Sequence, residues 1–469
     1  MAAGGAERPD HAHPPRRGQA QRLWKEHLKV SDGNQRTRYA LVGLGSRAEM
    51  YVNALASGFP DTAELVALCD SNQTRIAAYN GWLTDAGHPA LPAYTPDRFE
   101  EMLTAERVDA VIVCTTDSAH DHYLVSAMNN GRRAITEKPM TVDVAKCRAI
   151  LDTQRRTGVP VEVTFNYRYN PVHQRVRELL ADDTVGRIGS VTFEWLLDVQ
   201  HGADYFRRWH REREHSGGLL VHKSSHHFDL VNWWLDDRPE LVFGMGRLFF
   251  YGESNGARHG LARDYARAAG SEEARSDPFA LDLAASPRMR ALYLDAEHED
   301  GYLRDRNVFG SGITVEDDMS VLARYRSGVS LNYQLHAYSP YEGYRVCFNG
   351  SGGRLELAVR ENDYARSPVE DGFRLERPPG TDAADFTRAT ITRYPLFAEP
   401  EVLLDEPLEP GHGGGDELML RALFGPPAAD PLGLRADHVA GANALAVGLA
   451  ATESFRIGAP VRVSDLLPL

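Results

Sequence analysis

The chain has 469 residues, 42% of them apolar and 25% charged, values that are typical of a globular protein of two or three domains and exclude a largely disordered chain. Its formal net charge of −14 argues against non-specific binding of nucleic acid. No apolar run is long enough for a membrane-spanning helix. The four cysteines form no C-x-x-C pair, so neither a disulfide framework nor a structural zinc site is expected.

Residues 1–37 are predicted to form a disordered tail, because they are rich in Pro, Gly, Arg, His and Ala. Arg16 and Arg17 form a twin-arginine pair, but the stretch that follows, GQAQRLWKEHLKV, lacks the apolar run of an export signal. We therefore expect a cytoplasmic protein.

Residues 38–160 alternate between apolar strands and helices. Residues 39–42 form the first expected strand, and ELVALCD ends the second at Asp70. The run VDAVIVCTT (108–116) is typical of a buried parallel strand, and a helix and the stretch RRAITEKP follow it. This alternation predicts an α/β fold with a doubly wound sheet.

A glycine-rich turn follows the first strand. Gly43, Gly45 and Ala48 fit the pattern G-x-G-x-x-A, in which the glycines let the backbone approach a diphosphate and the small residue lets helix and strand pack. Asp70, at the end of the next strand, can bind a ribose diol and repel a 2′-phosphate. These residues predict a dinucleotide site that prefers NAD, a preference that the nearby Arg75 weakens; a turn that merely packs is the alternative.

After about residue 160 the pattern changes to longer, alternating strands with glycine-containing turns at 327–328 and 350–353. Residues 161–469 are therefore expected to form a second α/β domain with a large, mostly antiparallel open sheet. The Ala-rich segment 434–455 is predicted to be a helix that packs back on the rest of the molecule.

A polar insertion, rich in Arg, Asp and Glu, spans residues 251–310. Its segment 297–309, EHEDGYLRDRNVF, mixes aromatic side chains with both charges. That composition suits a sugar-contacting loop and suits a solvated, salt-bridged surface equally well.

The segment 216–235, SGGLLVHKSSHHFDLVNWWL, is predicted to be one helix after a glycine pair. His222, His226 and Asp229 fall at i, i+4 and i+7 and share a face. Ionisable groups on an apolar helix cost desolvation unless they line a cavity or are paired. Because histidine accepts a proton near neutral pH, we interpret this face as one that transfers protons or binds substrate, with structural histidines as the alternative.

The spacing of His222 and His226 also suits two zinc ligands. The metalloprotease motif has Glu directly after the first His, whereas this chain has Lys223, whose charge disfavours a metal. No metal site is therefore predicted. His227 is one residue off the shared face and is interpreted as a surface or capping histidine.

The segment GHGGGDELM (411–419) is a glycine-rich loop with three interpretations. It is a flexible loop that brings His412 to a pocket, a phosphate-binding loop, or a plain turn. The first interpretation is favoured, because no strand of the alternating pattern precedes the segment.

Several motifs occur together in an order that resembles the Gfo/Idh/MocA family of oxidoreductases, over residues 38–465. They are G-x-G-x-R with Arg47, the strand-ending Asp70, VIVCTTDSAHDHY, EKP, NYRYNP and the helix ending His-x-x-Asp. The resemblance implies a Rossmann domain followed by an α/β domain with a large open sheet. It also implies a cofactor between the two, and a homo-dimer or homo-tetramer built on the sheets.

By the same resemblance, Lys138 is the active-site lysine close to the nicotinamide and the substrate, held by Glu137 and Pro139. His226 matches the catalytic histidine of the family. The family usually has Asp where this chain has His222, and Gly where it has Ser224. That departure bears on the family's usual proton relay.

The predicted cofactor is NAD. Contacts with it are expected from ten residues, which are Gly43, Gly45, Ser46, Arg47, Asp70, Arg75, Thr115, His120, Glu137 and Lys138.

The resemblance implies NAD-dependent oxidation of a ring hydroxyl of a sugar or glycoside, with no nucleic-acid or membrane partner. In this mechanism Lys138 polarises the reacting oxygen, His226 takes its proton and Asp229 orients the imidazole. A non-catalytic NAD-binding regulator is a further alternative.

The motif GHGGGD also resembles a loop of the NAD-dependent α-N-acetylgalactosaminidases, in which the loop's histidine lies in the active site. A second interpretation is therefore an NAD-dependent glycosidase, in which transient C3 oxidation, elimination, water addition and re-reduction leave no net redox change. His222, His412 and tyrosines such as Tyr167 or Tyr344 would supply the extra acid–base groups.

Overall fold

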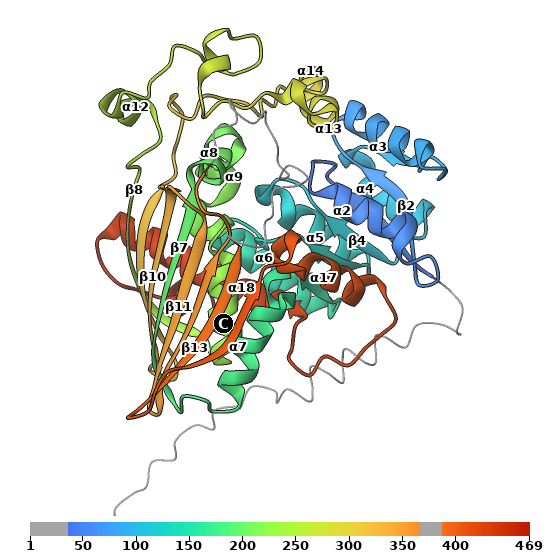
Figure 1. The fold of residues 1–469 in the computed structure, drawn as a ribbon. Coiled ribbons are helices and arrows are strands. Elements are labelled where there is room, and N and C mark those ends of the chain that lie inside the picture. The colour runs from blue at the N-terminus through green and yellow to red at the C-terminus, as the bar shows by residue number, and fades with distance from the viewer. Residues whose placement is uncertain (1–35, 366–386) are drawn as a thin grey trace, which may run out of the picture. The chain divides into compact units, whose positions relative to one another are not determined.

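Two β-sheets covered by helices form the fold of residues 37–469 (Figure 1). The computed structural model describes residues 36–365 and 387–469. The predicted tail therefore lies, up to residue 35, outside the described residues.

The first sheet has seven strands in the order β15-β6-β5-β4-β1-β2-β3. Six of them pair in parallel, as expected for apolar strands with both faces covered, and β15 joins β6 antiparallel at one edge. The strands are β1 (Thr37–Val42), β2 (Ala63–Cys69), β3 (Ala93–Tyr94), β4 (Ala110–Val113), β5 (Arg133–Thr136), β6 (Val161–Val163) and β15 (Ala436–Asp437).

Alternate residues of β1 face two different helical layers. Tyr39 and Leu41 belong to a core with α2 and α3, whereas Ala40 and Val42 belong to a core with α4, α5 and α6. The predicted doubly wound sheet is confirmed. The helices are α2 (Ala48–Asn53), α3 (Gln73–Asp85), α4 (Phe99–Ala105), α5 (His120–Asn129) and α6 (Val144–Thr157).

The second sheet has nine strands in the order β14-β13-β12-β11-β7-β10-β9-β8-β16. Only the β7–β10 pair is parallel among the described pairs, so the expected mostly antiparallel sheet is confirmed. The strands are β7 (Ile188–Asp198), β8 (Pro239–Arg247), β9 (Asp318–Tyr325), β10 (Ser330–Ser339), β11 (Gly343–Gly350), β12 (Gly353–Arg360), β13 (Arg388–Pro395), β14 (Glu401–Pro407) and β16 (Val461–Arg462).

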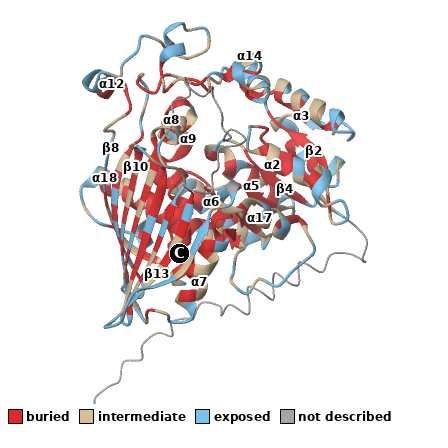
Figure 2. Cartoon of the chain, in the orientation of Figure 1, coloured by how far each residue is buried: buried red, intermediate tan, exposed pale blue. Residues whose placement is uncertain are grey.

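One face of this second sheet is buried and the other is open, as the alternating colours of its strands show (Figure 2). Helices α7 (Pro171–Ala181), α11 (Ser225–Leu235) and α18 (His438–Ile457) belong to the core of the buried face. The hairpins predicted at 327–328 and 350–353 join β9 to β10 and β11 to β12.

The predicted helix 216–235 is wrong as a single element. The chain forms α10 (Leu219–His222) and α11, with a break at Lys223 and Ser224. In a continuous helix the amide of His226 would bond to the carbonyl of His222; instead it donates to the carbonyl of Lys223. The His222 carbonyl accepts from Lys138 Nζ at 3.1 Å, so a contact from a different domain interrupts the helix.

The Ala-rich helix, expected over 434–455, is α18 and begins later, at His438. Asp437 caps it, because its carboxylate accepts from the amides of Val439 and Ala440. The residues just before the helix form β15 and complete the first sheet.

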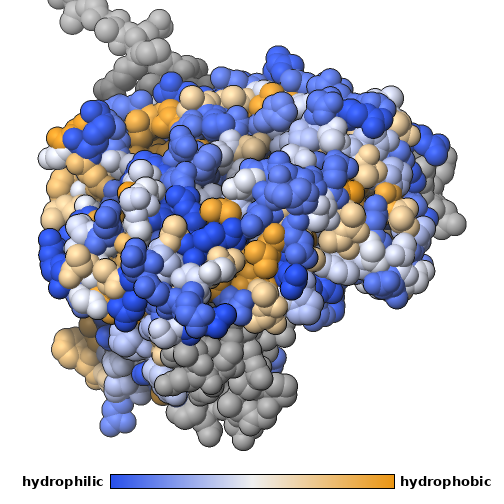
Figure 3. Space-filling model, turned by 90° about the horizontal axis from the view of Figure 1, so that it is seen from above, coloured by the Kyte–Doolittle hydropathy of each residue, from blue (hydrophilic) through white to orange (hydrophobic). Residues whose placement is uncertain are grey.

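The insertion 251–310 runs across the top of the view in Figure 1, from the end of β8 to the neighbourhood of α3. It has little regular structure. Its elements are α12 (Glu253–His259), two 3-10 turns at Glu273–Ser276 and Leu283–Ala285, α13 (Pro287–Met289), a π-helical turn at Arg290–Leu294 and α14 (Glu297–Asp300). Seen from above the view of Figure 1, the surface is mostly hydrophilic with scattered apolar spots (Figure 3).

The remaining helices with α-helical hydrogen bonding are short or lie beside the cleft described below. They are α8 (Val199–Arg207), α9 (Arg213–Ser216), α16 (Pro410–Gly413), α17 (Gly415–Phe424) and α19 (Val463–Leu466). Within the two described ranges, no helix has the length and apolar character needed to cross a membrane.

Candidate active site

A cleft of about 710 Å³ opens at the carboxyl ends of the parallel strands. That volume lies within the usual range of ligand pockets, roughly 300–1,000 Å³. Its walls come from the first sheet, from the segment 205–226 of the second domain, from the insertion and from the loop at His412. Carboxyl ends of strands in an open α/β sheet are where such folds bind ligands.

The glycine turn forms one end of the cleft and fits a dinucleotide. Gly43 has φ of +87°, and a Cβ there would lie 2.5 Å from the amide nitrogen of Thr115, so no side chain is tolerated. Gly45 lines the cleft, where a Cβ would meet only the Tyr293 hydroxyl, at 3.6 Å. The backbone is therefore bare where a diphosphate would approach.

Asp70 lies beside this turn and is held by backbone amides. Its two carboxylate oxygens accept from the amides of Leu44 at 2.6 Å and Asn72 at 2.8 Å. Burial raises the pKa of Asp70, and these two hydrogen bonds lower it. Asp70, the residue predicted to bind the ribose, thus lines the cleft in a fixed orientation.

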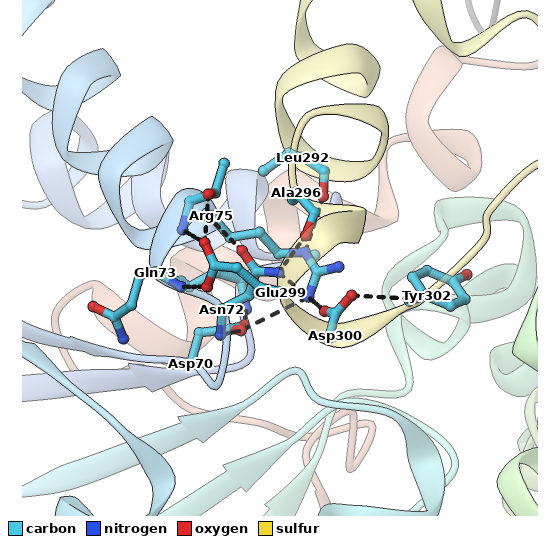
Figure 4. Close-up of polar contacts among 12 residues, drawn as sticks. Asp70, Asn72, Gln73, Arg75, Leu292, Ala296, Glu299, Asp300 and Tyr302 are labelled. Carbon is cyan, nitrogen blue, oxygen red and sulfur yellow. Dashed lines mark hydrogen bonds and ion pairs between the residues drawn. The ribbon is translucent and has the colours of Figure 1, made fainter. Parts of the chain in front are cut away.

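Arg75 also lines the cleft, but its charge is engaged. Its guanidinium lies 2.7 Å from Asp300 of the insertion and 3.8 Å from Asp70, and its Nε donates to the carbonyl of Leu292 (Figure 4). Arg75 therefore faces two carboxylates before any ligand arrives.

The insertion contacts the glycine turn as well. The amide of Ser46 donates to the Tyr293 hydroxyl at 2.9 Å, and that hydroxyl donates to Ser46 Oγ at 3.1 Å. The segment 297–309, whose composition suits a sugar-contacting loop and a solvated surface equally well, borders the cleft through Tyr302 and Arg304.

The EKP turn holds Lys138 at the other end of the cleft. Glu137 does not point away from the protein; it accepts from Arg47 Nε and from the Tyr51 hydroxyl, both at 2.7 Å. The Lys138–Pro139 peptide bond is cis. Glu137 and Arg47 therefore pin the turn, although both also line the cleft.

Lys138 Nζ lies 3.4 Å from His222 Nε2, and His222 Nδ1 lies 2.5 Å from Asp117. Burial lowers the pKa of Lys138 to about 8, and Asp117 opposes that shift. Burial also lowers the pKa of His222 and raises that of Asp117, so it favours the neutral form of both groups.

This chain has His222 where the family usually has Asp, but a carboxyl group is still linked to the lysine. Asp117 supplies this group, and the imidazole of His222 lies between it and Lys138.

His226 lines the cleft and stacks on Tyr167, with ring centroids 4.4 Å apart. Burial lowers its pKa well below the usual value, with the positive charge of Lys138 as a further cause. Its Nδ1 has no hydrogen-bond partner among the described residues. Burial therefore favours the neutral form of the His226 imidazole at pH 7.

The glycine-rich loop brings His412 to the cleft, where its ring lies 5.5 Å from that of Tyr167. His412 Nδ1 is 2.7 Å from Asp416, which also accepts from Asn166 and pairs with Arg47. Burial raises the pKa of Asp416, but the hydrogen bond from His412 and the charge of Arg47 lower it below its usual range. This is a second histidine–carboxylate pair.

Four residues take positions that differ from those expected. Asp229 does not orient His226, because both its oxygens bind Arg168 at 2.6 and 2.7 Å. His120 is fully buried and contacts the carbonyls of Pro139 and Thr115, so it supports the backbone of the site from inside the protein. The other two, discussed next, lie in the second domain.

His227 is not a surface histidine. It is fully buried, stacks on Trp195 at 4.0 Å and lies 2.7 Å from the Tyr333 hydroxyl. Tyr344 is also buried and lies 2.6 Å from His173 Nε2. These groups support the floor of the site and do not line the cleft.

The remaining predicted cofactor ligands, Ser46 and Thr115, line the cleft. Sequence reasoning missed Asp117, although its place just after an apolar parallel strand is a usable signal. It also missed Arg208 and Arg304, which line the cleft and share one carboxylate, Asp204, at 2.6 and 2.7 Å. No pattern in the sequence places those two arginines together.

Comparison with known proteins gives the family. Residues 37–165 match the model for "Oxidoreductase family, NAD-binding Rossmann fold", and residues 177–463 match that for "Oxidoreductase family, C-terminal alpha/beta domain". The chain is 35% identical over 422 residues to the protein named putative oxidoreductase YteT of Bacillus subtilis (strain 168), covering 88% of this chain and 94% of that protein.

Two further relatives are more distant. The scyllo-inositol 2-dehydrogenase (NAD(+)) of the same organism is 25% identical over 257 residues, which cover 53% of this chain and 70% of that one. The WlbA dehydrogenase of Bordetella pertussis, solved with NADH and UDP-GlcNAcA, shares the fold with a TM-score of 0.58 and 19% identity, covering 93% of this chain and 100% of that one. This chain belongs to the Gfo/Idh/MocA family of NAD(P)-dependent oxidoreductases.

Proposed function

We propose that the protein oxidises a ring hydroxyl of a sugar or glycoside with NAD⁺. The observation that supports this most directly is a pair of basic groups that line the cleft. They are a desolvated lysine, Lys138, and a neutral histidine, His226. That scyllo-inositol 2-dehydrogenase is a relative is consistent with a polyhydroxylated ring as substrate.

Each group has one task in this scheme. The Lys138 ammonium donates a hydrogen bond to the reacting oxygen and stabilises the negative charge that develops on it. His226 accepts the hydroxyl proton, which a neutral imidazole can do at pH 7. NAD⁺, which the glycine turn and Asp70 would hold, would supply the hydride acceptor. His222 and Asp117 position Lys138 and take up proton changes next to it.

The proposed cofactor is NAD and not NADP. A 2′-phosphate would enter beside the carboxylates of Asp70 and Asp300, and the guanidinium of Arg75 beside them is already paired with Asp300. Like charges at such distances cost several kcal/mol in recognition.

A second candidate is the glycosidase reaction. The observation that favours it is the second acid–base pair, His412 and Asp416, which reaches the cleft through a loop that the oxidation step does not need. After oxidation at C3, His412 would remove the acidified C2 proton and the group at C1 would leave. Water then adds at C1, and the hydride returns to C3, so the net reaction is hydrolysis.

One experiment separates the two. The purified protein is incubated with NAD⁺ and a panel of glycosides and free sugars, while NADH absorbance and released aglycone are followed together. Stoichiometric NADH with an intact glycosidic bond supports oxidation, whereas aglycone without net NADH supports the glycosidase. Binding of NAD⁺ without conversion of any compound would contradict both.

We also propose a homo-dimer or homo-tetramer that associates through the open face of the nine-stranded sheet, where Met245 and Leu322 are 65% and 56% exposed. The cytoplasm is the proposed location, because all four cysteines are buried and unpaired, as is usual in a reducing compartment.

A further inference from the structure

We infer that residues 290–304 of the insertion, here called the strap, close over the bound dinucleotide and retain it from one turnover to the next. The inference depends on the dinucleotide site of the family and not on which sugar is the substrate.

The strap is fastened to the first turn of α3, next to the ribose ligand Asp70. Glu299 accepts from the free amides of Gln73 and Thr74 at 2.6 and 2.8 Å (Figure 4). Asn72, which caps α3, donates to the carbonyl of Ala296 at 2.9 Å and to Asp300 at 3.1 Å. The Asn72 side chain is fully buried, so its contact with the Ala296 carbonyl lies inside the protein, whereas the contacts of Glu299 lie at the surface.

An apolar contact supports the same attachment. Leu292 and Tyr293 are 1% and 6% exposed and belong to one core with Ile76 and Tyr79 of α3. Burying a side chain of this size contributes roughly 1.5–3 kcal/mol. The strap therefore adheres to the nucleotide-binding half through its own small core, and lifting it would expose that core.

Tyr293 places the strap on the diphosphate side of the site. Its hydroxyl contacts both the amide and the side chain of Ser46, directly after the glycine turn. In a Rossmann domain this turn is where the diphosphate binds. A bound diphosphate would take the Ser46 amide, and the phenol would then lie against the phosphates.

Arg304, at the end of the strap, adds positive charge at the same place. Its guanidinium lies 5.6 Å from the centre of the Tyr293 ring and lines the cleft. Arg208 lines the cleft too, and the two cations share the single carboxylate of Asp204. Arg304 is 4% exposed, and its Nε has no partner among the described residues. A diphosphate would supply both the missing charge and the missing acceptor.

Both ends of the insertion are anchored in the second sheet, at β8 and β9. The cofactor thus lies between two parts of the chain that contact each other above it, and it leaves only when the strap lifts. Slow release of the dinucleotide suits a reaction that regenerates its own cofactor. The strap would therefore be of most use in the glycosidase reaction, which has no net redox change.

The test measures release directly. Protein loaded with NADH is mixed with a large excess of NAD⁺, and the loss of protein-bound NADH fluorescence gives the release rate. Tyr293→Ala and Asp300→Ala are each expected to speed release about tenfold or more, equivalent to about 1.4 kcal/mol of lost retention. The association rate should change little. Glu272→Ala is the control, because Glu272 pairs only with Arg275 on an exposed part of the insertion.

Tyr293→Phe keeps the ring and removes only the hydroxyl, so it is expected to fall between wild type and Tyr293→Ala. Thermal unfolding checks that each variant is folded. Equal release of NADH by wild type and both alanine variants would overturn the inference. Since no substrate is added, a failure of the proposed sugar chemistry leaves this test unaffected.

Discussion

Lys138 is the residue whose protonation decides the chemistry of the site. Burial lowers its pKa to about 8. If its ammonium polarises the reacting oxygen, the fraction of active enzyme falls as pH rises through that value. We therefore predict that kcat/KM for sugar oxidation declines above about pH 8. A profile that rises through pH 8 instead would identify neutral Lys138 as the base.

Substitution at the same position gives a second prediction. Lys138→Met removes the donor and is expected to lower kcat by about 10²- to 10³-fold, the usual cost of losing one donor to a developing oxyanion. Lys138→Arg keeps a charge that does not titrate in this range, so its residual activity should lack the decline near pH 8. The measurement is initial rate against pH, with cofactor affinity followed separately by fluorescence.

The coenzyme preference is also decided at the scale of residues. Asp70→Ser removes the charge that faces the ribose, and Asp300→Asn frees Arg75 from its ion pair. The double variant is expected to shift the ratio of kcat/KM for NAD to that for NADP by about tenfold or more toward NADP, since 1.4 kcal/mol is one factor of ten. Asp295→Asn, an exposed strap residue paired with Arg290, is the matched control. An unchanged ratio would contradict the role given to these carboxylates.

At the scale of elements, the contact of α18 with α10 holds His222 in place. A Cβ at Gly448 would lie 2.4 Å from the carbonyl oxygen of Leu220, so Gly448→Ala cannot be accommodated without movement. We expect it to destabilise the protein by about 1–3 kcal/mol, the typical cost of overpacking. Activity should also fall, because the turn that carries His222 moves. The readouts are the thermal unfolding midpoint and kcat.

Gly81→Ala in α3 is the matched control for this prediction. No atom lies within 4 Å of its added Cβ, and alanine is the better helix former by about 0.5–1 kcal/mol. It should therefore raise the midpoint slightly. Equal effects of the two substitutions would show that the close approach at Gly448 is not the cause.

The two sheets could be predicted from the sequence, because unbroken apolar runs and alternating runs follow directly from whether one or both faces of a strand are covered. The break between α10 and α11 could not. It depends on Lys138, which is far away in the sequence and captures a helical carbonyl. The break also shifts His222 out of register with His226 and Asp229. The expected pairing of Asp229 with His226 fails for a different reason, because both oxygens of Asp229 bind Arg168.

The candidate site divides in the same way. The glycine turn, Asp70 and Lys138 follow strand ends, so their neighbourhood is implied by the topology of a parallel sheet. The placement of the insertion is not implied, because its polar residues form pairs with α3 that no local pattern encodes. Asp300 and Glu299 have the composition of a solvated surface, yet they contact the cofactor domain.

At the scale of the whole molecule, the open face of the nine-stranded sheet is the proposed site of self-association. Leu322→Glu places a charge on that face, where two copies would meet, and is expected to give a monomer in light scattering. Ile457→Glu is the control, since Ile457 is 45% exposed at the end of α18, a helix that packs on the opposite, buried face of the sheet. Retention of the wild-type mass by Leu322→Glu would contradict association through this face.

The late return of the chain to its first sheet has a consequence for synthesis. Phe424 of α17 packs against Tyr39 and Tyr51, and β15 pairs with β6 at the sheet edge. As the polypeptide leaves the ribosome, the nucleotide-binding half emerges first but lacks these partners until nearly the whole message has been translated. During that interval it presents uncovered aromatic rings and an unpaired edge, the features that chaperones recognise and that promote aggregation. A ribosome that stalls midway would therefore release an insoluble fragment.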